Sequence, residues 1–487
     1  MRLSEILKRA GLTVPPLVVD PEIHGITADS RAVRPGMIFA ALPGVAVDGA
    51  TFIPQALAQG ASALLASDAV TPAFSVPCVS SPSPRHALAL MAAVLAGPQP
   101  AHIAAVTGTN GKSSTADFLR QLWSMSGKPA ASIGTLGLIS DIPVEAPPPL
   151  TTPDAVSMAQ TLAQLKTAGI DHVALEASSH GLDQHRLDGV RLGAGGFCNL
   201  TRDHLDYHGT MDAYRTAKLR LFADLLPEGA IAAFNADMDA QTVTALRDLA
   251  QARRLKPRSV GEQGETIRLL NATPLPHGQI VSLALFGEKL PDLTIGLTGR
   301  FQVDNLLLAA SMIWAQDDQA RGILDLIPRL QGVRGRAELA VTLNNGASVY
   351  VDYAHTPDAL DHLLHSLRPH AQNRLIVVFG AGGDRDRGKR PLMGGIAAKL
   401  ADLAIVTDDN PRSEDPASIR AAILAACPDA LEIGDRRAAI AAALSEARPG
   451  DVVVVAGKGH ESGQTVAGVT SPFDDRAVIR ELAGVPA

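Results

Sequence analysis

Short runs of consecutive apolar residues recur along the chain and are separated by Ala-rich segments with helical spacing. Such runs are typical of strands buried on both faces of a parallel sheet. In the middle of the chain and in its last third, the runs cover residues 102–107, 172–175, 231–235, 375–379, 403–407 and 451–455. Residues 38–41 and 61–66 form similar buried segments nearer the N-terminus. The pattern predicts an α/β fold with mostly parallel sheets.

Two breaks in this pattern indicate a division into domains. The first is Gly97-Pro98-Gln99-Pro100, directly before the apolar run at residue 102, and the second lies at residues 327–332. Pro and Gly clusters ahead of a buried strand are typical of domain boundaries. At roughly 100–200 residues per domain, a chain of 487 residues fits three domains. We therefore predict three α/β domains, at residues 1–98, 99–331 and 332–487, with an amphipathic helix within residues 1–11.

The most informative local motif is a Gly-rich loop between a predicted strand and a helical pattern at residues 115–126. It runs Gly108-Thr109-Asn110-Gly111-Lys112-Ser113-Ser114. Glycines let backbone N–H groups turn towards a phosphate, and the N-terminus of the next helix adds donors and positive potential. Lys112 can reach the terminal phosphates, and the Ser113 hydroxyl can bind Mg²⁺. Because Gly108 stands two residues later than in the common phosphate-loop pattern, a plain Gly-rich turn with a solvated lysine is the competing interpretation.

Composition and charge exclude several classes of protein. The net charge is −7 and aromatic residues make up 3%, so the chain has neither the basic excess nor the stacking platforms of nucleic-acid binders. Cys78, Cys198 and Cys427 form no CxxC pair, which argues against a zinc site and a disulfide framework. No apolar run approaches the roughly 20 residues of a membrane span, and the first residues do not form a signal peptide. We expect a cytoplasmic protein with no nucleic-acid partner and no membrane span.

The loop and five further segments resemble the signatures of the Mur ligase family. In chain order they are residues 108–113, 176–186, 199–209, 352–357, 409–412 and 457–461. The loop alone would also suit folylpolyglutamate synthases and cyanophycin synthetases. The later segments narrow the resemblance to Mur ligases that add diaminopimelate.

The resemblance implies a fold and a reaction. It implies a UDP-binding N-terminal domain, a central P-loop-type ATPase domain and a Rossmann-like C-terminal domain. ATP would phosphorylate the D-glutamate carboxylate of UDP-N-acetylmuramoyl-L-alanyl-D-glutamate, and an amine of meso-diaminopimelate would attack the acyl phosphate. Such a reaction needs charge neutralisation at the γ-phosphate and positioning of three substrates. We expect a monomer that acts in peptidoglycan precursor synthesis.

Four residues carry the chemistry that the resemblance implies: Lys112, Glu176, His204 and Lys218. We expect two Mg²⁺ ions, with Ser113, Glu176, His204 and a carbamylated Lys218 as ligands. Glu176 follows a predicted strand, where ligands bind in an open α/β sheet. Without the resemblance, we would favour an Arg partner role for Glu176, a structural role for His204 and a solvated Lys218.

Contacts to ATP and to the UDP-muropeptide are also implied by the resemblance. The ATP contacts are Gly108, Thr109, Asn110, Gly111, Lys112, Ser113, Ser114, Asn305, Arg336, Asp352 and His355. The UDP-muropeptide contacts are Ala28, Ser30, Val45, Ala46, Val47, Thr151, Thr152, Ser178, Gln184 and Arg186. The family usually has Asn where Gln302 stands, which weakens any role for Gln302 but not for Asn305. For the Thr and Ser residues, ordinary capping before a helix that begins after Asp154 is the alternative.

Arg412, in the segment Asp409-Asn410-Pro411-Arg412, is the residue we expect to select the added amino acid. Meso-diaminopimelate differs from lysine by a second carboxylate, which a guanidinium binds through two hydrogen bonds. Family members with this Arg add diaminopimelate. Arg385, Gly457 and Glu461 match further contacts, and Glu461 can bind the ammonium. Surface ion pairs are the alternative for both arginines.

Three other functions compete with this interpretation. They are a lysine-adding or folylpolyglutamate-type ligase, a nucleotide-sensing module without chemistry, and a motor ATPase. Arg412 argues against lysine, and the N-terminal domain argues against folate. The presence of Lys112, Glu176, His204 and Lys218 argues against a module that has lost its chemistry.

Overall fold

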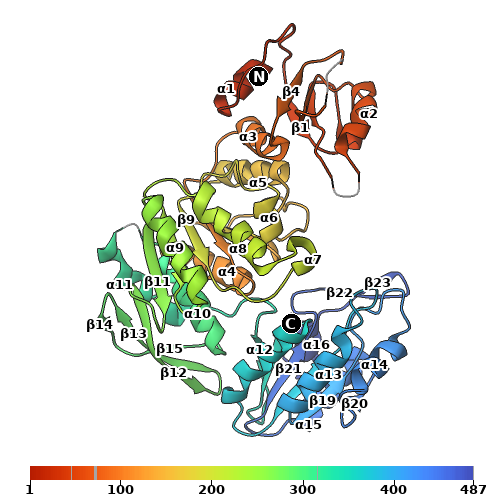
Figure 1. Cartoon of the computed structure of the whole chain (residues 1–487). Coiled ribbons are helices and arrows are strands. Elements are labelled where there is room, and N and C mark those ends of the chain that lie inside the picture. Colours follow the sequence, from red (N-terminus) through yellow and green to blue (C-terminus); the bar gives the residue numbers. More distant parts are fainter. Residues whose placement is uncertain (45–46, 71–73, 315, 486–487) are drawn as a thin grey trace. The chain divides into compact units, whose positions relative to one another are not determined.

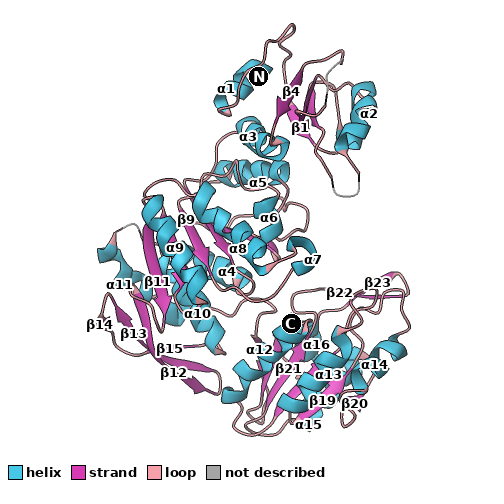
Figure 2. Ribbon diagram, in the orientation of Figure 1, coloured by secondary structure: helices cyan, strands magenta, loops and turns pink. Residues whose placement is uncertain are grey.

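The computed structural model describes residues 1–44, 47–70, 74–314 and 316–485 (Figure 1). The chain divides into two compact units, each described by itself. Unit 1 comprises Met1–Val260 with Leu308–Ala320, and unit 2 comprises Gly261–Leu307 with Arg321–Ala487. Helices and strands alternate through much of the chain, as the apolar runs predict (Figure 2).

Unit 1 begins with a small parallel sheet of four strands in the order β1-β2-β3-β4. The strands are β1 (Gly25–Thr27), β2 (Met37–Ala40), β3 (Ala63–Ser67) and β4 (Cys78–Ser81), and the helices are α1 (Leu3–Arg9), α2 (Ile53–Ala58) and α3 (Pro84–Ala96). The predicted N-terminal helix is confirmed as α1, whose Leu3, Ile6 and Leu7 are fully buried. The buried segments predicted at residues 38–41 and 61–66 are confirmed as β2 and β3.

The second sheet of unit 1 carries the Gly-rich loop. Its strands run in the order β11-β10-β9-β5-β8-β6-β7, all parallel to their neighbours except the edge strand β7. They are β5 (His102–Thr107), β6 (Ala130–Gly134), β7 (Gly137–Ser140), β8 (His172–Glu176), β9 (Ala194–Phe197), β10 (Ile231–Asn235) and β11 (Lys256–Gly261). The helices are α4 (Lys112–Met125), α5 (Ala155–Thr167), α6 (Ser179–Asp183), α7 (Leu205–His208), α8 (Met211–Arg220) and α9 (Ala240–Ala252). The sheet therefore places the carboxyl ends of β5, β8 and β9 side by side.

The predicted helix after the loop begins three residues earlier than residue 115. α4 starts at Lys112, because Gly111 adopts a left-handed φ of 87° and its carbonyl accepts the first helical bond from Thr115 N. Lys112 and Ser113 therefore lie in the first turn of the helix, where backbone N–H groups are free of helical partners. The helix predicted after Asp154 is confirmed as α5, whose N-terminal N–H groups donate to the Asp154 carboxylate.

Unit 2 contains an antiparallel segment that the sequence did not reveal. Its strands are β12 (Ile267–Leu275), β13 (Gly278–Leu285), β14 (Glu288–Lys289) and β15 (Leu293–Ile295), and β13 pairs with the other three. The segments α10 (Arg300–Ser311) and α11 (Ala320–Leu324) follow. Only Ile267 and Leu269 are buried in the strand from 267 to 275, so it lacks the continuous apolar run that marks the parallel strands.

The last part of unit 2 is a six-stranded sheet in the order β16-β17-β21-β18-β19-β20, parallel except for the edge strand β16. Its strands are β16 (Glu338–Thr342), β17 (Ser348–Asp352), β18 (Leu375–Phe379), β19 (Leu403–Val406), β20 (Leu431–Glu432) and β21 (Val452–Ala456). Its helices are α12 (Pro357–Leu367), α13 (Lys389–Leu400), α14 (Pro416–Leu424), α15 (Arg436–Glu446) and α16 (Asp475–Leu482), and β22 (Gly463–Val466) pairs with β23 (Val469–Pro472).

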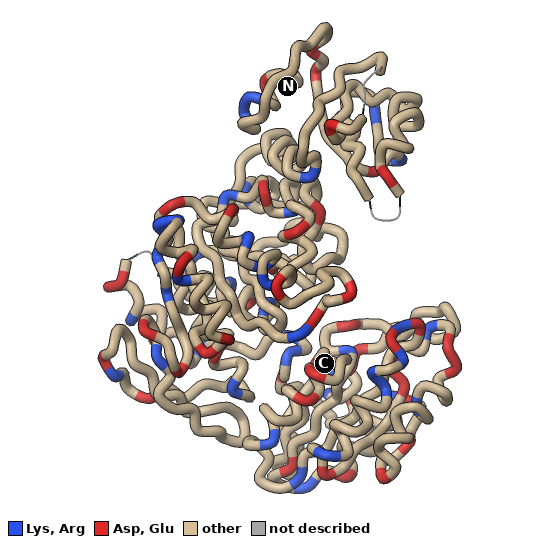
Figure 3. The backbone as a smooth tube through the Cα atoms, viewed as in Figure 1, with Lys and Arg blue, Asp and Glu red and all other residues tan. Residues whose placement is uncertain are grey.

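The three strands predicted in this part are confirmed, although β19 ends one residue earlier than predicted and β21 is shifted by one residue. β21 begins at Val452 rather than Asp451, because the Asp451 carboxylate accepts backbone N–H bonds from Arg374 and Arg448 and closes a turn. Acidic and basic residues are interspersed along the backbone of each unit (Figure 3). Among the residues that the structure describes, no helix is both long and apolar enough to cross a bilayer.

Candidate active site

The Gly-rich loop leaves β5 at Thr107 and enters α4 at Lys112. Gly108 has a φ of 150° and Gly111 a φ of 87°, a region that L side chains rarely adopt. A Cβ on Gly108 would also lie 2.9 Å from the Cβ of Cys198. Both positions therefore favour glycine along this backbone path.

Two lysines converge on the first carbonyl of the loop. Lys112 Nζ donates to Gly108 O at 2.9 Å and to Thr109 O at 2.8 Å. Lys218 Nζ, from α8, donates to the same Gly108 O at 2.7 Å, and its residue is 1% exposed. Burial, and then the Lys112 cation, lower the pKa of Lys218 well below its ordinary value. Lys218 is thus no solvated lysine, and its amine is shifted towards the uncharged form that can react with CO₂.

Asn199, for which the sequence predicted no role, joins the Gly-rich loop to the segment after β9 by hydrogen bonds. Its side-chain oxygen accepts from Asn110 N at 2.8 Å, its Nδ2 donates to Asn110 O at 3.1 Å, and its carbonyl accepts from Thr109 N at 2.9 Å. Thr109 Oγ1 adds a bond to Thr201 O at 3.1 Å. Asn199 lies in the segment 199–209 that resembles a family signature. The resemblance therefore indicated this segment, but not the contacts of Asn199 to the loop.

Glu176 lies at the carboxyl end of β8, directly beside the end of β5, where Val106 pairs with Glu176. Its residue is 2% exposed, and its carboxylate accepts from Thr135 N at 2.8 Å and Thr135 Oγ1 at 3.2 Å. The partner that the sequence alone favoured for Glu176 was an arginine. Thr135 takes that place, and it sits just beyond β6, a neighbour in the sheet that is remote in sequence.

Unpaired buried hydroxyls at this sheet edge fit a polar ligand. Among the described residues, Thr107 Oγ1 and Ser179 Oγ are buried without a hydrogen-bond partner. Thr107 ends β5, and Ser179 begins the helix that follows β8. Buried hydroxyls without partners are rare unless water, an ion or a ligand satisfies them. Together with Ser113, which is 8% exposed, and Glu176, they form an oxygen-rich edge suited to Mg²⁺ and phosphate.

His204 is the most exposed of the four residues expected to act in the chemistry. Its side chain is 48% exposed, and Nε2 lies 3.5 Å from a carboxylate oxygen of Asp203. His204 has a φ of 51°, and its ring meets that of His180 edge-on at 4.9 Å. This position leaves the imidazole accessible to an incoming ligand.

The side chains expected to hold the muropeptide form one hydrogen-bonded group around Glu176. Thr152 Oγ1 donates to Glu176 O at 2.7 Å and accepts from Ser178 N at 3.0 Å. Arg186 donates to Thr152 O and to Gln184 Oε1, both at 2.7 Å. Ser178 caps α6 through a bond from Gly181 N, so the alternative of a helix cap describes one of its contacts. Ser178 also bonds Thr152, so the cap and the hydrogen-bonded group share one side chain.

Of the residues expected to bind UDP near the N-terminus, Ser30 begins a short 3₁₀ helix, and Ala28 and Val47 lie in bends of the chain. Ser30 is 8% exposed and donates to Gln55 Oε1 at 2.9 Å, whereas Val47 is 55% exposed. Ala28 follows β1. Val45 and Ala46 lie outside the described residues.

In unit 2, Arg336 stacks on the ring of Tyr353 at 4.7 Å, and Asp352 accepts from Ala337 N and Ala354 N, both at 2.7 Å. Burial raises the pKa of Asp352, although Arg336 and these N–H groups oppose the shift. Burial lowers the pKa of His355, whose carbonyl accepts from Lys389 at 2.9 Å.

Gln302, the residue that departs from the family pattern, has a definite place in unit 2. It is 1% exposed, and its Nε2 donates to Arg336 O at 2.8 Å. Its Oε1 accepts from Asn305 Nδ2 at 3.5 Å. The Gln side chain thereby orients the amide of Asn305 and holds the start of the segment that carries Arg336.

Arg412 is folded over a neighbouring loop of unit 2. It has a φ of 55°, its Nη1 donates to Gly383 O at 2.8 Å, and its N–H donates to Thr465 O at 3.0 Å. A Cβ on Gly382 would approach Arg412 Nη1 to 2.8 Å. Among the described residues, Arg412 pairs with backbone carbonyls and not with a surface carboxylate, while Arg385 is an exposed residue after β18.

Lys458 organises the polar group beside Arg412. Its side chain is fully buried, and Nζ donates to Asn410 Oδ1 at 3.0 Å and Gly463 O at 2.7 Å, 3.7 Å from both Asp409 Oδ1 and Glu461 Oε2. Asn410 Nδ2 in turn donates to Glu461 Oε2 at 2.9 Å. Burial lowers the pKa of Lys458. The segment at residues 457–461 contains Lys458, but only the fold shows that Lys458 binds Asn410 and lies beside Glu461.

Comparisons with known proteins agree with this geometry. Three family models match in succession: "Mur ligase family, catalytic domain" at residues 22–105, "Mur ligase middle domain" at 106–313 and "Mur ligase, glutamate ligase domain" at 335–459.

Curated relatives and solved structures cover nearly the whole chain. The UDP-N-acetylmuramoyl-L-alanyl-D-glutamate–2,6-diaminopimelate ligase of Caulobacter vibrioides is 53% identical over 100% of this chain and 99% of its own length. The enzyme of that name from Brucella melitensis is 50% identical, over 94% and 93%. A solved structure with the same name is 33% identical, covers 99% of both chains and has a TM-score of 0.73. The folylpolyglutamate synthase of Mycobacterium tuberculosis, 17% identical over 82% of this chain and 95% of its own with a TM-score of 0.62, shares the fold.

Proposed function

Because the chain belongs to the Mur ligase family, we propose that it adds meso-diaminopimelate to UDP-N-acetylmuramoyl-L-alanyl-D-glutamate at the expense of ATP. The observation that carries the choice of amino acid is the group formed by Arg412, Asn410 and Glu461. Asn410 Oδ1 accepts from Thr465 N at 3.0 Å, and Thr465 O accepts from Arg412 N. A guanidinium and a carboxylate held in one framework match an amino-acid end that carries both a carboxylate and an ammonium.

The loop and α4 bind the phosphates of ATP in this proposal. The N–H groups at the start of α4 and the glycine backbone face the phosphates, and the helix N-terminus contributes positive potential. Lys112 exchanges its bonds to Gly108 O and Thr109 O for phosphate oxygens. Asn305, Arg336, Asp352 and His355 remain our proposed contacts to the rest of the nucleotide.

Ser113, Glu176, His204 and a carbamylated Lys218 are the proposed ligands of two Mg²⁺ ions. Bound there, Mg²⁺ supplies charge neutralisation at the γ-phosphate. The carbamate forms when the uncharged Lys218 amine attacks CO₂ and loses a proton, which converts a buried amine into an anionic oxygen donor. Thr135 holds the Glu176 carboxylate in place through its N–H and hydroxyl.

The reaction then proceeds in two steps on the substrates. The D-glutamate carboxylate attacks the γ-phosphorus and releases ADP, forming the acyl phosphate. An amine of diaminopimelate attacks the acyl carbon, loses a proton and expels phosphate as the amide bond forms. The group of Thr152, Ser178, Gln184 and Arg186 positions the muropeptide, since a fixed near-attack geometry supplies much of the rate in such reactions.

The test of the amino-acid specificity is phosphate release with the UDP-linked dipeptide and meso-diaminopimelate, lysine, or glutamate with a folate acceptor. Release that requires diaminopimelate supports the proposal, and release with ATP alone contradicts it. Arg412→Ala should raise the KM for diaminopimelate about a hundredfold, the value of a bidentate charged contact near 3 kcal/mol, and leave ATP binding unchanged. Arg437→Ala, which removes a surface arginine paired with Glu481, is the matched control. Equal loss of ATP and diaminopimelate binding in Arg412→Ala would refute the selector role.

The test of the modified lysine is Lys218→Ala with and without short-chain carboxylates. We expect a loss of activity that acetate or formate partly restores, because a free carboxylate replaces the missing anionic oxygens. Lys166→Ala, which removes a lysine paired with Asp171, should show neither effect. Full activity of Lys218→Ala would contradict the carbamate.

Three further parts of the proposal concern the chain as a whole. We propose domain limits at residues 1–98, 99–331 and 332–487, a cytoplasmic location and a monomeric state. Sedimentation velocity measures the last of these, and a dimer at micromolar concentration would contradict it.

A further inference from the structure

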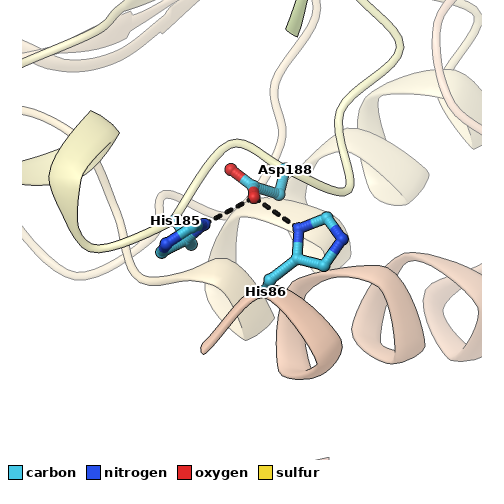
Figure 4. A group of neighbouring side chains, drawn as sticks. All are labelled: His86, His185 and Asp188. Atoms are coloured by element: carbon cyan, nitrogen blue, oxygen red, sulfur yellow. Dashed lines mark hydrogen bonds and ion pairs between the residues drawn. The ribbon is translucent and has the colours of Figure 1, made fainter. Parts of the chain in front are cut away.

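A buried carboxylate in unit 1, Asp188, binds the side chains of His86 and His185 (Figure 4) and of Arg220, which come from separate elements. Asp188 has a side chain that is 1% exposed. His86 Nδ1, from α3, lies 2.6 Å from Asp188 Oδ2, and His185 Nδ1 lies 2.7 Å from the same oxygen. Arg220, the last residue of α8, donates to both carboxylate oxygens at 2.8 and 2.6 Å. One side chain therefore joins α3, the segment after α6, and α8.

The donor atoms of His86, His185 and Asp188 lie within 4.8 Å of one another, a spacing that a metal ion can bridge. The arrangement nonetheless favours a hydrogen-bonded group, the Asp188 clasp, in which Asp188 binds His86, His185 and Arg220. The Arg220 guanidinium already occupies both oxygens of Asp188 and neutralises its charge, so a divalent cation would add uncompensated positive charge. Burial alone would raise the pKa of Asp188, but the bonds from His185, Arg220 and His86 outweigh it and hold that pKa below its ordinary range.

The contact between α3 and the segment after α6 is close as well as polar. A Cβ on Gly189 would lie 2.3 Å from Ala89 O and 2.9 Å from the Cβ of Ala93, so α3 rests on the glycine backbone. Gln99 Nε2 donates to Gly189 O at 2.7 Å, and Gln99 Oε1 accepts from Arg191 N at 3.0 Å. Direct packing at Gly189 and the two hydrogen bonds of Gln99 hold α3 close to this segment.

This contact connects two stretches of chain that serve opposite ends of one proposed substrate. α3 belongs to the region matched by the first family model, which also contains the UDP contact Ser30. Gln184 and Arg186, which flank His185, belong to the region matched by the second model and hold the peptide end in the proposed function. A ligand that bridges two subsites binds more tightly when the distance between them is fixed, because the second contact becomes intramolecular.

We propose that Asp188 is a positioning residue that clasps the UDP-binding region to the muropeptide loop through His86, and so fixes the spacing of the two substrate ends. This inference rests on the proposed function. Asp188 and His86 touch no substrate in it; they act through Gln184 and Arg186.

The experiment compares two probes by calorimetry on the full chain: UDP alone, and UDP-N-acetylmuramoyl-L-alanyl-D-glutamate. In Asp188→Asn and His86→Ala, affinity for the whole substrate should fall at least about tenfold, while affinity for UDP stays within about twofold. His86 is 44% exposed, so His86→Ala keeps the fold even if Asp188→Asn does not. His86→Gln, whose amide can donate to Asp188, should restore binding.

Asp171→Asn is the matched control, because Asp171 precedes β8 at the opposite edge of the sheet and pairs with Lys166 at 2.6 Å. It should weaken neither probe. An equal loss of affinity for UDP and for the whole substrate in His86→Ala would overturn the clasp and indicate a merely structural contact. Stoichiometric Zn²⁺ binding that His86→Ala abolishes would also overturn it. If the wild-type chain binds neither probe, the proposed function itself is wrong. If the wild-type chain binds both probes and the variants bind them equally well, only the clasp is wrong.

Discussion

Replacing Gly134 by alanine should displace Glu176 without otherwise changing the sheet. Gly134 ends β6, next to β8, and a Cβ there would lie 2.0 Å from Glu176 Oε1 and 2.5 Å from its Cδ and Cγ. Ordinary contacts between such atoms lie at about 3.5–4.0 Å. The carboxylate must therefore move by more than about 1 Å, since the strand backbones are fixed by their ladder bonds.

The size of the effect follows from what Glu176 then loses. Its bonds from Thr135 N, at 2.8 Å, and Thr135 Oγ1, at 3.2 Å, cannot both survive such a movement. A hydrogen bond to a charged group contributes about 1.5–3 kcal/mol. A displacement of about 1 Å in a positioned group lowers the rate about a hundredfold, or about 2.7 kcal/mol. We therefore expect kcat/KM to fall about a hundredfold in Gly134→Ala.

The assay is diaminopimelate-dependent phosphate release, with calorimetric ATP binding and the thermal midpoint measured on the same preparations. Gly193→Ala is the control, because a Cβ there meets only Ile103 O, at 3.9 Å. Gly193→Ala should retain activity within about threefold of the wild type. If Gly134→Ala matched this control in kcat/KM, the assignment of Glu176 to the reaction centre would be wrong.

Three further predictions concern ATP binding, pH and stability. Gly108→Ala should abolish ATP binding, measured by calorimetry, because its Cβ meets Cys198 at 2.9 Å and its φ of 150° disfavours a side chain; retained binding would contradict the loop assignment. Burial lowers the pKa of His172 to about 4 in the folded chain. Between pH 6.5 and pH 4 the unfolded chain therefore binds a proton at His172 more readily than the folded chain, and the free energy of unfolding should fall as the pH falls through this range. His172→Gln should flatten this part of the thermal-midpoint profile, and an unchanged profile would contradict the reasoning. Asp475→Asn should destabilise unit 2 by about 3–5 kcal/mol in urea unfolding, because Arg436 would remain buried with a weakened partner. Arg436 and Asp475 are both fully buried and doubly hydrogen-bonded, so Arg436→Met with Asp475→Leu should cost less than Asp475→Asn alone.

Strands and turns whose form depends on nearby residues could be predicted from the sequence. The apolar runs at residues 102–107 and 375–379 coincide with β5 and β18, because a strand buried on both faces must be apolar throughout. The loop motif predicted the place of the proposed nucleotide site, and the backbone angles of Gly108 and Gly111 favour the glycines of that motif. β12 escaped prediction, because most of its residues are exposed or partly exposed and it is held as a strand by pairing with β13, which the chain reaches later.

The tertiary structure alone decided which residues meet. Nothing near Glu176 in sequence identifies Thr135 as its partner, and nothing near Lys218 shows that it reaches Gly108 O from 110 positions away. The lowered pKa of Lys218 is a property of that burial, not of its helix. Likewise, the sequence supplied Arg412 as a cation, but only the fold places it on Gly383 and links it to Asn410. Parallel strands bring their carboxyl ends together from distant parts of the chain, so a motif can locate a site whose contacts only packing defines.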